Sequence, residues 1–240
     1  AEFYHLCPLD EFMHVASSKW IKALLKEKRY FSLMQPIIFA KTMQIHAHEF
    51  LIRGIDVDGS EISAPELLQA ANKSGLMEKM DCAAGLSAIE TAAKFNLLSK
   101  SFINIMPSST TGVDQNLKEW MVKIEELNLP LNTLVLEIVE SEQVTDQEKL
   151  RKIIIALKEK GIQIALDDFG AGFNNITTLF DLKPDYVKLD KALVQDIVTD
   201  ANQWNVVANL VDAATQVGVK VIAEGVENEE TMKALMAIGV

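Results

Sequence analysis

Residues 162–173 read IQIALDDFGAGF, an apolar run that stops at two adjacent carboxylates and continues into a turn bracketed by glycines. The apolar part has the length and composition of a buried β-strand. Asp167 and Asp168 repel one another, so placing them side by side costs free energy unless water, a cation or a proton compensates. A strand that ends in this way is a candidate metal site. The structural alternative is a solvated strand end followed by an acidic turn.

The same pattern recurs along the chain, and helical periodicity separates the apolar runs. Strands are predicted near residues 31–39, 44–53, 102–106, 134–139, 163–168, 186–190 and 220–224. Helices are predicted at residues 64–80, 80–98, 117–127, 146–160, 192–217 and 229–238. Strand alternating with helix is typical of an α/β fold with a parallel sheet. In a closed barrel of such units the carboxyl ends of the strands converge on one face, so we expect the polar residues there to meet in one pocket.

The bulk composition fits one such barrel. The chain has 240 residues, of which 49% are hydrophobic, and it contains no apolar run long enough to predict a membrane span. The first residues lack the pattern of a signal peptide. Cys7 and Cys82 could form one disulfide at most and do not have metal-site spacing. We therefore expect a cytoplasmic domain, which leaves room for a membrane-anchored parent protein.

The charge balance excludes some partners. The formal net charge is −11, and no basic cluster is longer than KEKR at residues 26–29. Binding of duplex DNA or RNA depends on many phosphate contacts from Lys and Arg, so neither is expected as a partner. A small phosphate ligand stays compatible with an acidic pocket, provided that divalent cations lie between the two.

The chain divides into two unequal parts. Residues 1–29 are interpreted as an N-terminal linker or capping helix, with an amphipathic helix near residues 20–27. Residues 30–240 are interpreted as the barrel domain. Pro36 predicts that the first strand kinks or lies at a sheet edge. A closed eight-stranded barrel needs one more strand after the helix at residues 229–238, so we expect an open barrel whose last strand is missing from this sequence.

The polar residues at the strand ends are suited to hard cations. Carboxylate and amide oxygens favour Mg²⁺, Mn²⁺ or Ca²⁺ over zinc. A shared carboxylate such as Asp167 could bridge two ions roughly 3.5–4 Å apart, the arrangement that drives phosphodiester hydrolysis. The candidate ligands are Glu49, Asn104, Glu137, Asp167, Asp168 and Glu224.

Three further residues have two interpretations each. Lys188 could orient the attacking water, although a strand lysine is most often a snorkelling surface residue. Arg53 could hold a phosphate oxygen by its forked donors or make a structural ion pair. Asp190 could be a partner of the metal site or the cap of the following helix.

His46 and His48 form an H-x-H pattern, which by itself suggests a metal-dependent amidohydrolase barrel. That interpretation needs further histidines on later strands. The other histidines, His5 and His14, precede the barrel, so the amidohydrolase hypothesis fails.

Seven motifs in order make the chain resemble an EAL domain, the bacterial cyclic di-GMP phosphodiesterase family. They are QPI at residues 35–37, EFLIR at 49–53, NIMP at 104–107, LEIVES at 136–141, DDFGAGF at 167–173, KLD at 188–190 and AEGVE at 223–227. The resemblance implies a modified TIM (β/α)8 barrel with an antiparallel first strand. It also implies hydrolysis of cyclic di-GMP to linear pGpG with two Mg²⁺ or Mn²⁺ ions.

The resemblance also assigns roles to particular residues. The six candidate ligands would hold the metals, with Glu49 and Glu224 also catalytic and Glu224 the general base. Lys188 would position the hydrolytic water, and Gln35 and Arg53 would contact the substrate. Glu140 would brace the loop at residues 168–175, which in this family links metal occupancy to dimerisation. The resemblance implies a homodimer, and it is compatible with a parent protein that has an upstream sensory or GGDEF-type domain. Ca²⁺ is expected to support binding but to inhibit cleavage, because its looser coordination misplaces the water.

The sequence departs from the family pattern in three places. Phe50 replaces the usual alanine of the signature tripeptide, and Asn174 and Asn175 replace a serine-rich pair. The family's glutamine-glycine segment of the last strand would lie beyond Val240. The main alternative function is a catalytically silent cyclic di-GMP receptor or dimerisation module, which loss of carboxylates would favour. A third hypothesis, an enolising or aldol-type barrel with one Mg²⁺, conflicts with the motif order.

Overall fold

The computed structural model describes residues 19–106, 110–139, 147–170 and 176–240. The strands are β1 (Tyr30–Phe39), β2 (Gln44–Ile55), β3 (Glu61–Ile62), β4 (Lys100–Ile105), β5 (Leu134–Val139), β6 (Gln163–Phe169), β7 (Tyr186–Leu189) and β8 (Lys220–Ala223). The helices are α2 (Ala64–Lys73), α3 (Met77–Lys94), α4 (Thr110–Glu126), the 3-10 turn η1 (Leu131–Thr133), α5 (Gln147–Glu159), α6 (Ile176–Leu182), α7 (Lys191–Val194), α8 (Ala201–Gln216) and α9 (Glu229–Ile238). A further helix covers residues 19–27. No helix within these ranges is long and apolar enough to cross a membrane.

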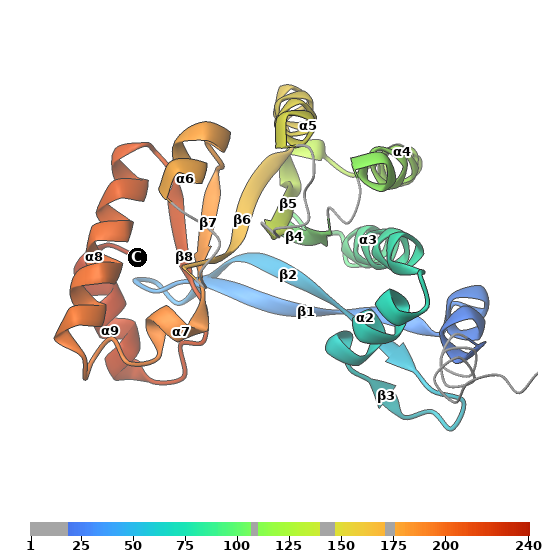
Figure 1. Cartoon of the computed structure of the whole chain (residues 1–240), viewed down its shortest axis with the longest axis horizontal. Helices are drawn as coiled ribbons and strands as arrows, with labels where there is room; N and C mark the ends of the chain where they lie inside the picture. Colours follow the sequence, from blue (N-terminus) through green and yellow to red (C-terminus); the bar gives the residue numbers. More distant parts are fainter. Residues whose placement is uncertain (1–18, 107–109, 140–146, 171–175) are drawn as a thin grey trace, which may run out of the picture.

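The strands form one curled sheet in the order β1-β2-β4-β5-β6-β7-β8, with β3 paired to β2 (Figure 1). β1 and β2 are an antiparallel hairpin, and the pairs from β2–β4 to β7–β8 are all parallel. The predicted α/β barrel topology with an antiparallel first strand is therefore confirmed. Pro36 lies in β1 at the sheet edge, where a missing N–H is tolerated. Among the described residues no strand bridges β8 and β1, so the barrel is open, as expected.

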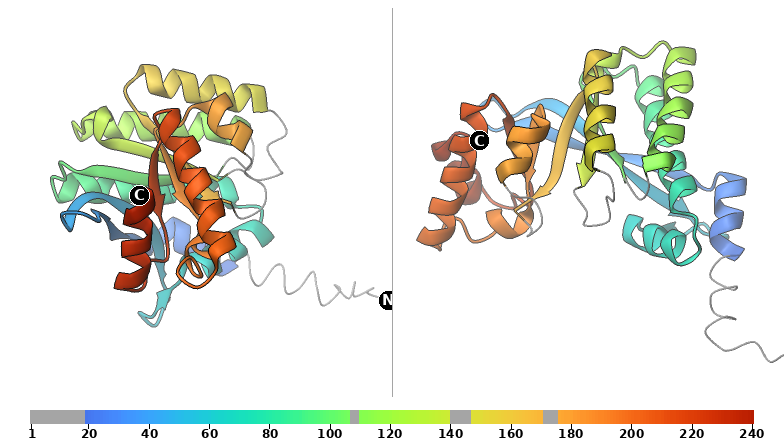
Figure 2. Two further views of the ribbon diagram at one scale, coloured as in Figure 1. Left: turned by 90° about the vertical axis from the view of Figure 1, so that its left-hand side faces the viewer. Right: turned by 45° about the horizontal axis from the view of Figure 1, so that its top comes forward.

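The helices pack against the outer face of the sheet, where the side chains that point outward are apolar. Figures 1 and 2 show α3, α4 and α5 beside β4 and β5, and α6, α8 and α9 around β7 and β8. Two buried apolar clusters fill these interfaces, one around Ile103, Trp120 and Leu136 and the other around Leu166 and Val207. The helices therefore cover the outer face of the sheet and do not cover its inner face, where the strands carry a different set of side chains.

Two predicted helices are interrupted in the structure. The helix expected at residues 64–80 is divided into α2 and α3 by a turn in which Gly75 has a φ of +62°, a conformation that favours glycine. The helix expected at residues 192–217 is divided into α7 and α8, because Asp200 caps α8 by accepting hydrogen bonds from two backbone N–H groups. α6 and β3 were not predicted.

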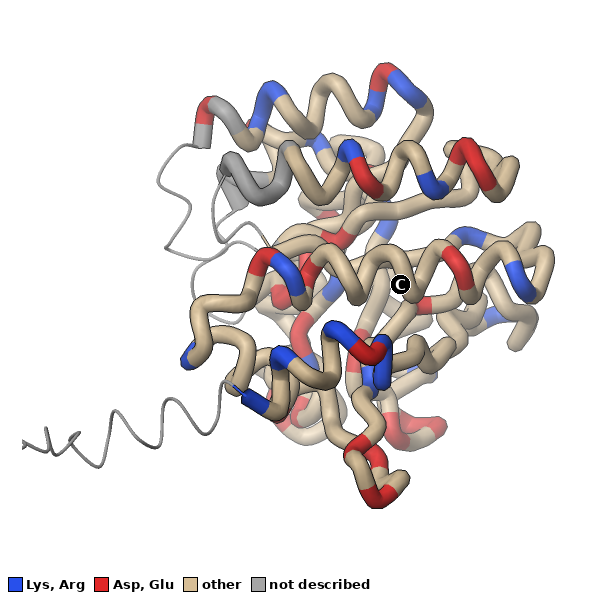
Figure 3. Tube along the Cα trace, turned by 90° about the vertical axis from the view of Figure 1, so that its right-hand side faces the viewer, with Lys and Arg blue, Asp and Glu red and all other residues tan. Residues whose placement is uncertain are grey.

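The outer surface carries charges of both signs. On the side drawn in Figure 3, basic and acidic positions are interspersed along the helices. Exposed ion pairs on the outer helices include Lys152 with Glu148 in α5 and Lys233 with Glu229 in α9. Such pairs contribute little to stability, about 0–1 kcal/mol each. The exposed ion pairs on the outer helices therefore add little to the stability of the fold.

Candidate metal and active site

The inner face of the curled sheet changes from apolar to polar along each strand. One apolar cluster contains the partly buried Ile37 of β1 and one side chain from each of the six mutually parallel strands: Ala47, Phe102, Val135, Ala165, Tyr186 and the partly buried Ile222. Residues two places apart on a strand share a face. The residues two places further along the same six segments are Glu49, Asn104, Glu137, Asp167, Lys188 and Glu224. The candidate residues therefore lie inside the barrel next to this apolar cluster, which we call the apolar floor.

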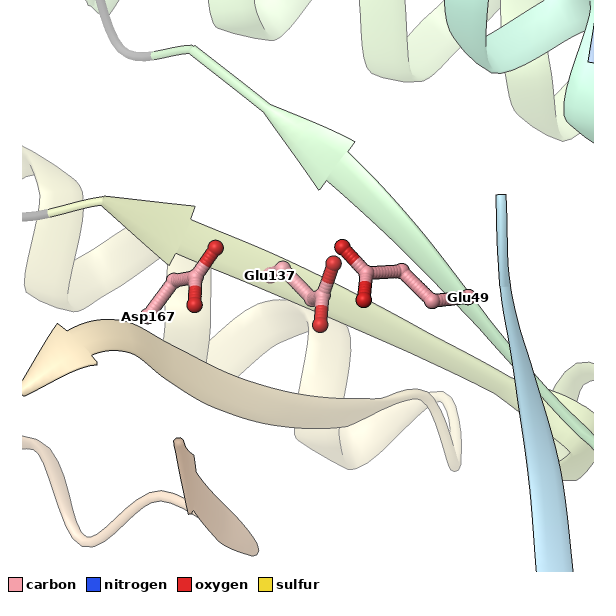
Figure 4. A group of neighbouring side chains, drawn as sticks. All are labelled: Glu49, Glu137 and Asp167. Carbon is pink, nitrogen blue, oxygen red and sulfur yellow. The ribbon is translucent and has the colours of Figure 1, made fainter. Parts of the chain in front are cut away.

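Five carboxylates converge on this inner face, and we call Glu49, Glu137, Asp167, Asp168 and Glu224 the acidic cluster. Oxygen atoms of Glu49, Glu137 and Asp167 all lie within 4.8 Å of one another, and the three side chains point toward one another from β2, β5 and β6 (Figure 4). A second group, also within 4.8 Å, joins Asp167 to Asp168 and Glu224. Asp167 belongs to both groups, which is the arrangement expected of a bridging carboxylate.

Asp168 joins its neighbour Asp167 because the strand is irregular at this point. In a regular strand two successive side chains point to opposite faces. Asp168 instead has a φ of +54°, and the pairing of β6 with β7 shifts register between Leu166 and Phe169. Its backbone N–H donates to Asp167 Oδ1 at 3.0 Å. A left-handed aspartate costs about 1 kcal/mol or more, and such strain is commonly found at functional sites.

Lys188 lies at the centre of the acidic cluster. Its side chain is 1% exposed, and Nζ lies 2.7 Å from Glu224, 2.8 Å from Glu137, 3.1 Å from Asp167 and 3.2 Å from Glu49. The alternative in which Lys188 is a snorkelling surface residue is therefore wrong. Glu137 is also fully buried, and its carboxylate accepts no hydrogen bond of good geometry from the described residues, so the ammonium supplies its compensation.

Burial and neighbouring charges shift the pKa values of the acidic cluster and of Lys188. Burial raises the pKa of Glu137, with the charges of Glu49 and Asp167 adding to the effect and the Lys188 ammonium opposing it. Burial also raises the pKa of Glu224 and of Asp168. Burial alone would lower the pKa of Lys188, but the surrounding carboxylates outweigh it and raise that pKa, so the lysine stays charged.

The donor set of the acidic cluster fits a hard divalent cation. Each of the two groups of carboxylates offers oxygen atoms from three residues within a span of 4.8 Å. Oxygen-only coordination by several carboxylates is typical of Mg²⁺, Mn²⁺ and Ca²⁺. A separate hollow of about 610 Å³ lies between the helix at residues 19–27, α3 and α4, and none of the acidic cluster lines it.

Of the other residues predicted for the site, some lie beside the acidic cluster, one caps a helix, and some lie outside the described residues. Gln35 pairs with Glu49 across the β1–β2 hairpin, and Asn104 pairs with Glu137 in register, so each shares a face with a member of the acidic cluster. Asp190 caps α7 by accepting from the Ala192 N–H at 2.7 Å, which is the capping alternative. Glu140 and the loop beyond Gly170, including Asn174 and Asn175, lie outside the described residues.

Arg53 lies beside β3. Its Nε is 3.2 Å from Glu61 Oε1, and its Nη1 donates to the carbonyl of Ile52 at 2.8 Å. The structural ion pair anticipated for this arginine is therefore present. A contact with substrate stays a prediction.

A buried aspartate behind β4 was missed by the sequence analysis. Asp81 of α3 is 5% exposed, and its carboxylate accepts hydrogen bonds from the Met106 N–H at 2.9 Å and from the Asn116 side chain at 2.8 Å. It thus ties α3 and α4 to the end of the strand that carries Asn104. The signal was a lone aspartate within the apolar face of a predicted helix, which is unusual for a charged residue.

The open α/β barrel and its inner carboxylates define a class: barrels whose site lies at the carboxyl ends of the strands. Within that class the chain belongs to the EAL domain family, whose family model matches residues 18–240. The resemblance read from the seven motifs is therefore confirmed.

Two relatives give the family a biochemical context. The chain is 28% identical over 222 residues to the cyclic di-GMP phosphodiesterase PA2567 of Pseudomonas aeruginosa, a match that covers 91% of this chain and 38% of that protein. It therefore spans less than half the length of this relative. It is also similar to the standalone EAL protein of Vibrio cholerae O395 in its cyclic di-GMP-bound form, with 27% identity, a TM-score of 0.79, and coverage of 88% of this chain and 87% of that one.

A second solved structure supports the fold. The chain superposes on Klebsiella pneumoniae BlrP1, in its complex with manganese and cyclic di-GMP, with a TM-score of 0.76 and 24% identity over 95% of this chain and 62% of that one. At this identity the likeness shows the fold alone. That structure holds both manganese and cyclic di-GMP.

Proposed function

We propose that this domain hydrolyses one phosphodiester bond of cyclic di-GMP and releases linear pGpG. The observation that carries the proposal is the acidic cluster: five carboxylates gathered above an apolar floor, in two groups that share Asp167. Membership of the EAL family supports the choice of substrate, because the relative PA2567 is a cyclic di-GMP phosphodiesterase.

The proposed cofactors are two Mg²⁺ or Mn²⁺ ions held by the six candidate ligands. These ligands are Glu49, Asn104, Glu137, Asp167, Asp168 and Glu224. When bound, such a pair of ions activates a water and neutralises the charge that develops on the phosphate during in-line displacement. The short spans within the two groups of carboxylates support this assignment.

The chain's own residues would handle the water and the substrate. Glu224 is the most exposed of the carboxylates around Lys188, at 28% against 14% for Glu49 and less for the others. Burial raises its pKa toward neutrality, which suits a general base. Lys188 would hold the attacking water by its ammonium protons. Gln35, opposite Glu49, and Arg53 would hold the cyclic dinucleotide.

Two alanine variants test the assignment of the acidic cluster. Glu49→Ala and Asp167→Ala each remove one carboxylate from the groups and should reduce turnover by about two orders of magnitude or more, because each removes an oxygen ligand of the ions that would activate the water. Chromatographic detection of pGpG measures turnover, and circular dichroism checks the fold. Glu148→Ala, on an exposed face of α5, is the control and should retain full activity. Normal hydrolysis by both cluster variants would remove the basis of the assignment.

A homodimer and an upstream sensory or GGDEF-type domain in the parent protein belong to the same proposal. The proposed link between metal occupancy and dimerisation runs through Glu140 and the adjoining loop. Light scattering with and without Mn²⁺ tests the dimer directly.

A further inference from the structure

The ammonium of Lys188 contacts the oxygens that a divalent cation would need. Its four contacts, at 2.7–3.2 Å, go to Glu224 Oε1, Glu137 Oε1, Asp167 Oδ1 and Glu49 Oε1. Glu49, Glu137 and Asp167 form the first of the two groups of carboxylates, and Glu224 belongs to the second. Lys188 therefore touches members of both groups.

The geometry is that of a coordinated cation and not of an ordinary salt bridge. An ammonium has three N–H donors, so it cannot donate a separate hydrogen bond to each of four carboxylates. It acts instead as a compact point charge surrounded by anions. At 1% exposure the lysine has almost no water to replace any of these contacts.

The charge balance explains why such a residue is needed. If all four carboxylates were ionised, one ammonium would leave three negative charges uncompensated, and Glu137 is completely buried. Removal of Lys188 would leave all four carboxylates facing one another, which strongly destabilises a buried site. A divalent cation would supply the same compensation more fully.

We propose that Lys188 is a built-in competitor of the divalent cation: its ammonium neutralises the acidic cluster and must give up oxygen contacts when a cation binds. The proposal rests on the proposed function in one respect, since it takes the acidic cluster to be a cation site. It adds that the affinity of the site is set lower by a residue of the chain itself. It also adds that the binding of a cation is what frees the ammonium to contact water or substrate.

The test is a titration with Mn²⁺ in the absence of any nucleotide. Calorimetry on the wild-type chain, Lys188→Met and Lys191→Met gives the affinity of each for the metal alone. Lys188→Met has a side chain of similar volume without the charge, and it should bind Mn²⁺ at least about tenfold more tightly. Lys191→Met removes an exposed lysine paired with Glu227 and should bind as the wild type does.

Thermal unfolding of the same proteins gives the second half of the test. In EDTA, Lys188→Met should melt at a lower temperature than the wild type, and Mn²⁺ should raise its melting temperature by more than it raises that of the wild type. An affinity of Lys188→Met equal to or weaker than that of the wild type would overturn the proposal. So would the absence of Mn²⁺ binding by both proteins.

A measurement on the wild-type chain covers the case in which Lys188→Met does not fold without metal. The ammonium protons of Lys188 are shielded from solvent, so the group should give a slowly exchanging ¹H–¹⁵N signal in EDTA. Titration with diamagnetic Mg²⁺ should shift or remove this signal, and a signal unchanged across the binding range would refute the competition. Because no substrate is present, these results do not depend on hydrolysis. A failure of hydrolysis with competition intact would instead reject the proposed function alone.

Discussion

Arg53 makes a structural ion pair and, in the proposed function, would also contact the substrate. It lies four residues after Glu49 on β2, and its guanidinium bridges to Glu61 of β3. Glu61 is more than half exposed, so the pair itself adds little to stability. The guanidinium also has donors that the pair does not use, and these are suited to a phosphate oxygen.

Two variants separate these roles of Arg53. Arg53→Ala should weaken the apparent affinity for cyclic di-GMP by about tenfold, because a charge-assisted hydrogen bond to phosphate contributes roughly 1.5 kcal/mol or more. Glu61→Gln breaks the same ion pair but keeps the arginine, so it should leave the affinity near that of the wild type. Calorimetric titration with the nucleotide in Ca²⁺ measures both. Equal affinities for Arg53→Ala and the wild type would limit this arginine to a structural role.

At the same scale, the sequence predicted the identity of the carboxylates better than the place of the lysine. Glu137 and Asp167 could be anticipated because acidic residues that interrupt apolar strand patterns are rare unless they have a use. The complete burial of Lys188 could not, because it depends on four carboxylates from four separate segments that meet only in three dimensions. Asp168 was predicted as a ligand, yet its left-handed backbone is a property of the folded strand.

At the scale of elements, Asp81 couples two helices to one strand. It joins α3 to the backbone at Met106 just after β4 and to Asn116 of α4. Nearby, the Trp120 indole N–H donates to the carbonyl of Cys82 at 3.1 Å, and the Trp120 ring packs directly against the backbone of Gly85. These contacts hold α3 and α4 together behind the strand that carries Asn104.

Asp81 should make the stability of the fold depend on pH. Burial raises its pKa to about 7, although hydrogen bonds from Met106 and Asn116 oppose the shift. The unfolded chain has a pKa near 3.9 at this group, so between about pH 4 and pH 7 the folded state binds more protons than the unfolded state. This contribution to stability is therefore complete below about pH 4 and is lost as the pH rises through 7.

The Asp81→Asn variant removes that dependence, because an amide does not titrate. Urea unfolding from about pH 4 to pH 8 should show that the wild type loses stability relative to the variant, by on the order of 4 kcal/mol at most. Asp181→Asn, at an exposed position of α6, is the control and should follow the wild-type curve. Parallel curves for Asp81→Asn and the wild type would show that Asp81 has an ordinary pKa.

The element boundaries were predicted where periodicity was strong and missed where a turn interrupts it. The seven longer strands were all anticipated, because each combines an apolar run with a polar end. The break between α2 and α3 depends on one residue with a left-handed backbone, Gly75. The break between α7 and α8 depends on Asp200, which caps the start of α8. β3 has two residues and depends on its pairing with β2, which is a tertiary effect.

At the scale of the whole molecule, the six parallel strands of the open sheet bring polar side chains and the apolar cluster beneath them together on one inner face. The size of the cation should decide whether that face supports chemistry. Ca²⁺ takes more ligands at longer and looser distances than Mg²⁺ does. We therefore expect Ca²⁺ to support binding of cyclic di-GMP while the rate of cleavage falls by about two orders of magnitude relative to Mg²⁺ or Mn²⁺. Parallel calorimetry and pGpG chromatography measure the two effects, and rapid hydrolysis in Ca²⁺ would contradict the proposed positioning of the water.

The central claim is that the acidic cluster hydrolyses cyclic di-GMP with the help of divalent cations. The most direct measurement is incubation of this chain with cyclic di-GMP in Mn²⁺, in Mg²⁺ and in EDTA, followed by chromatographic separation of substrate and product. The account predicts linear pGpG in the presence of either metal and none in EDTA. Binding of cyclic di-GMP without any product would contradict the proposed hydrolysis and would identify the domain as a receptor. The absence of both binding and product would contradict the hydrolase and the receptor alike.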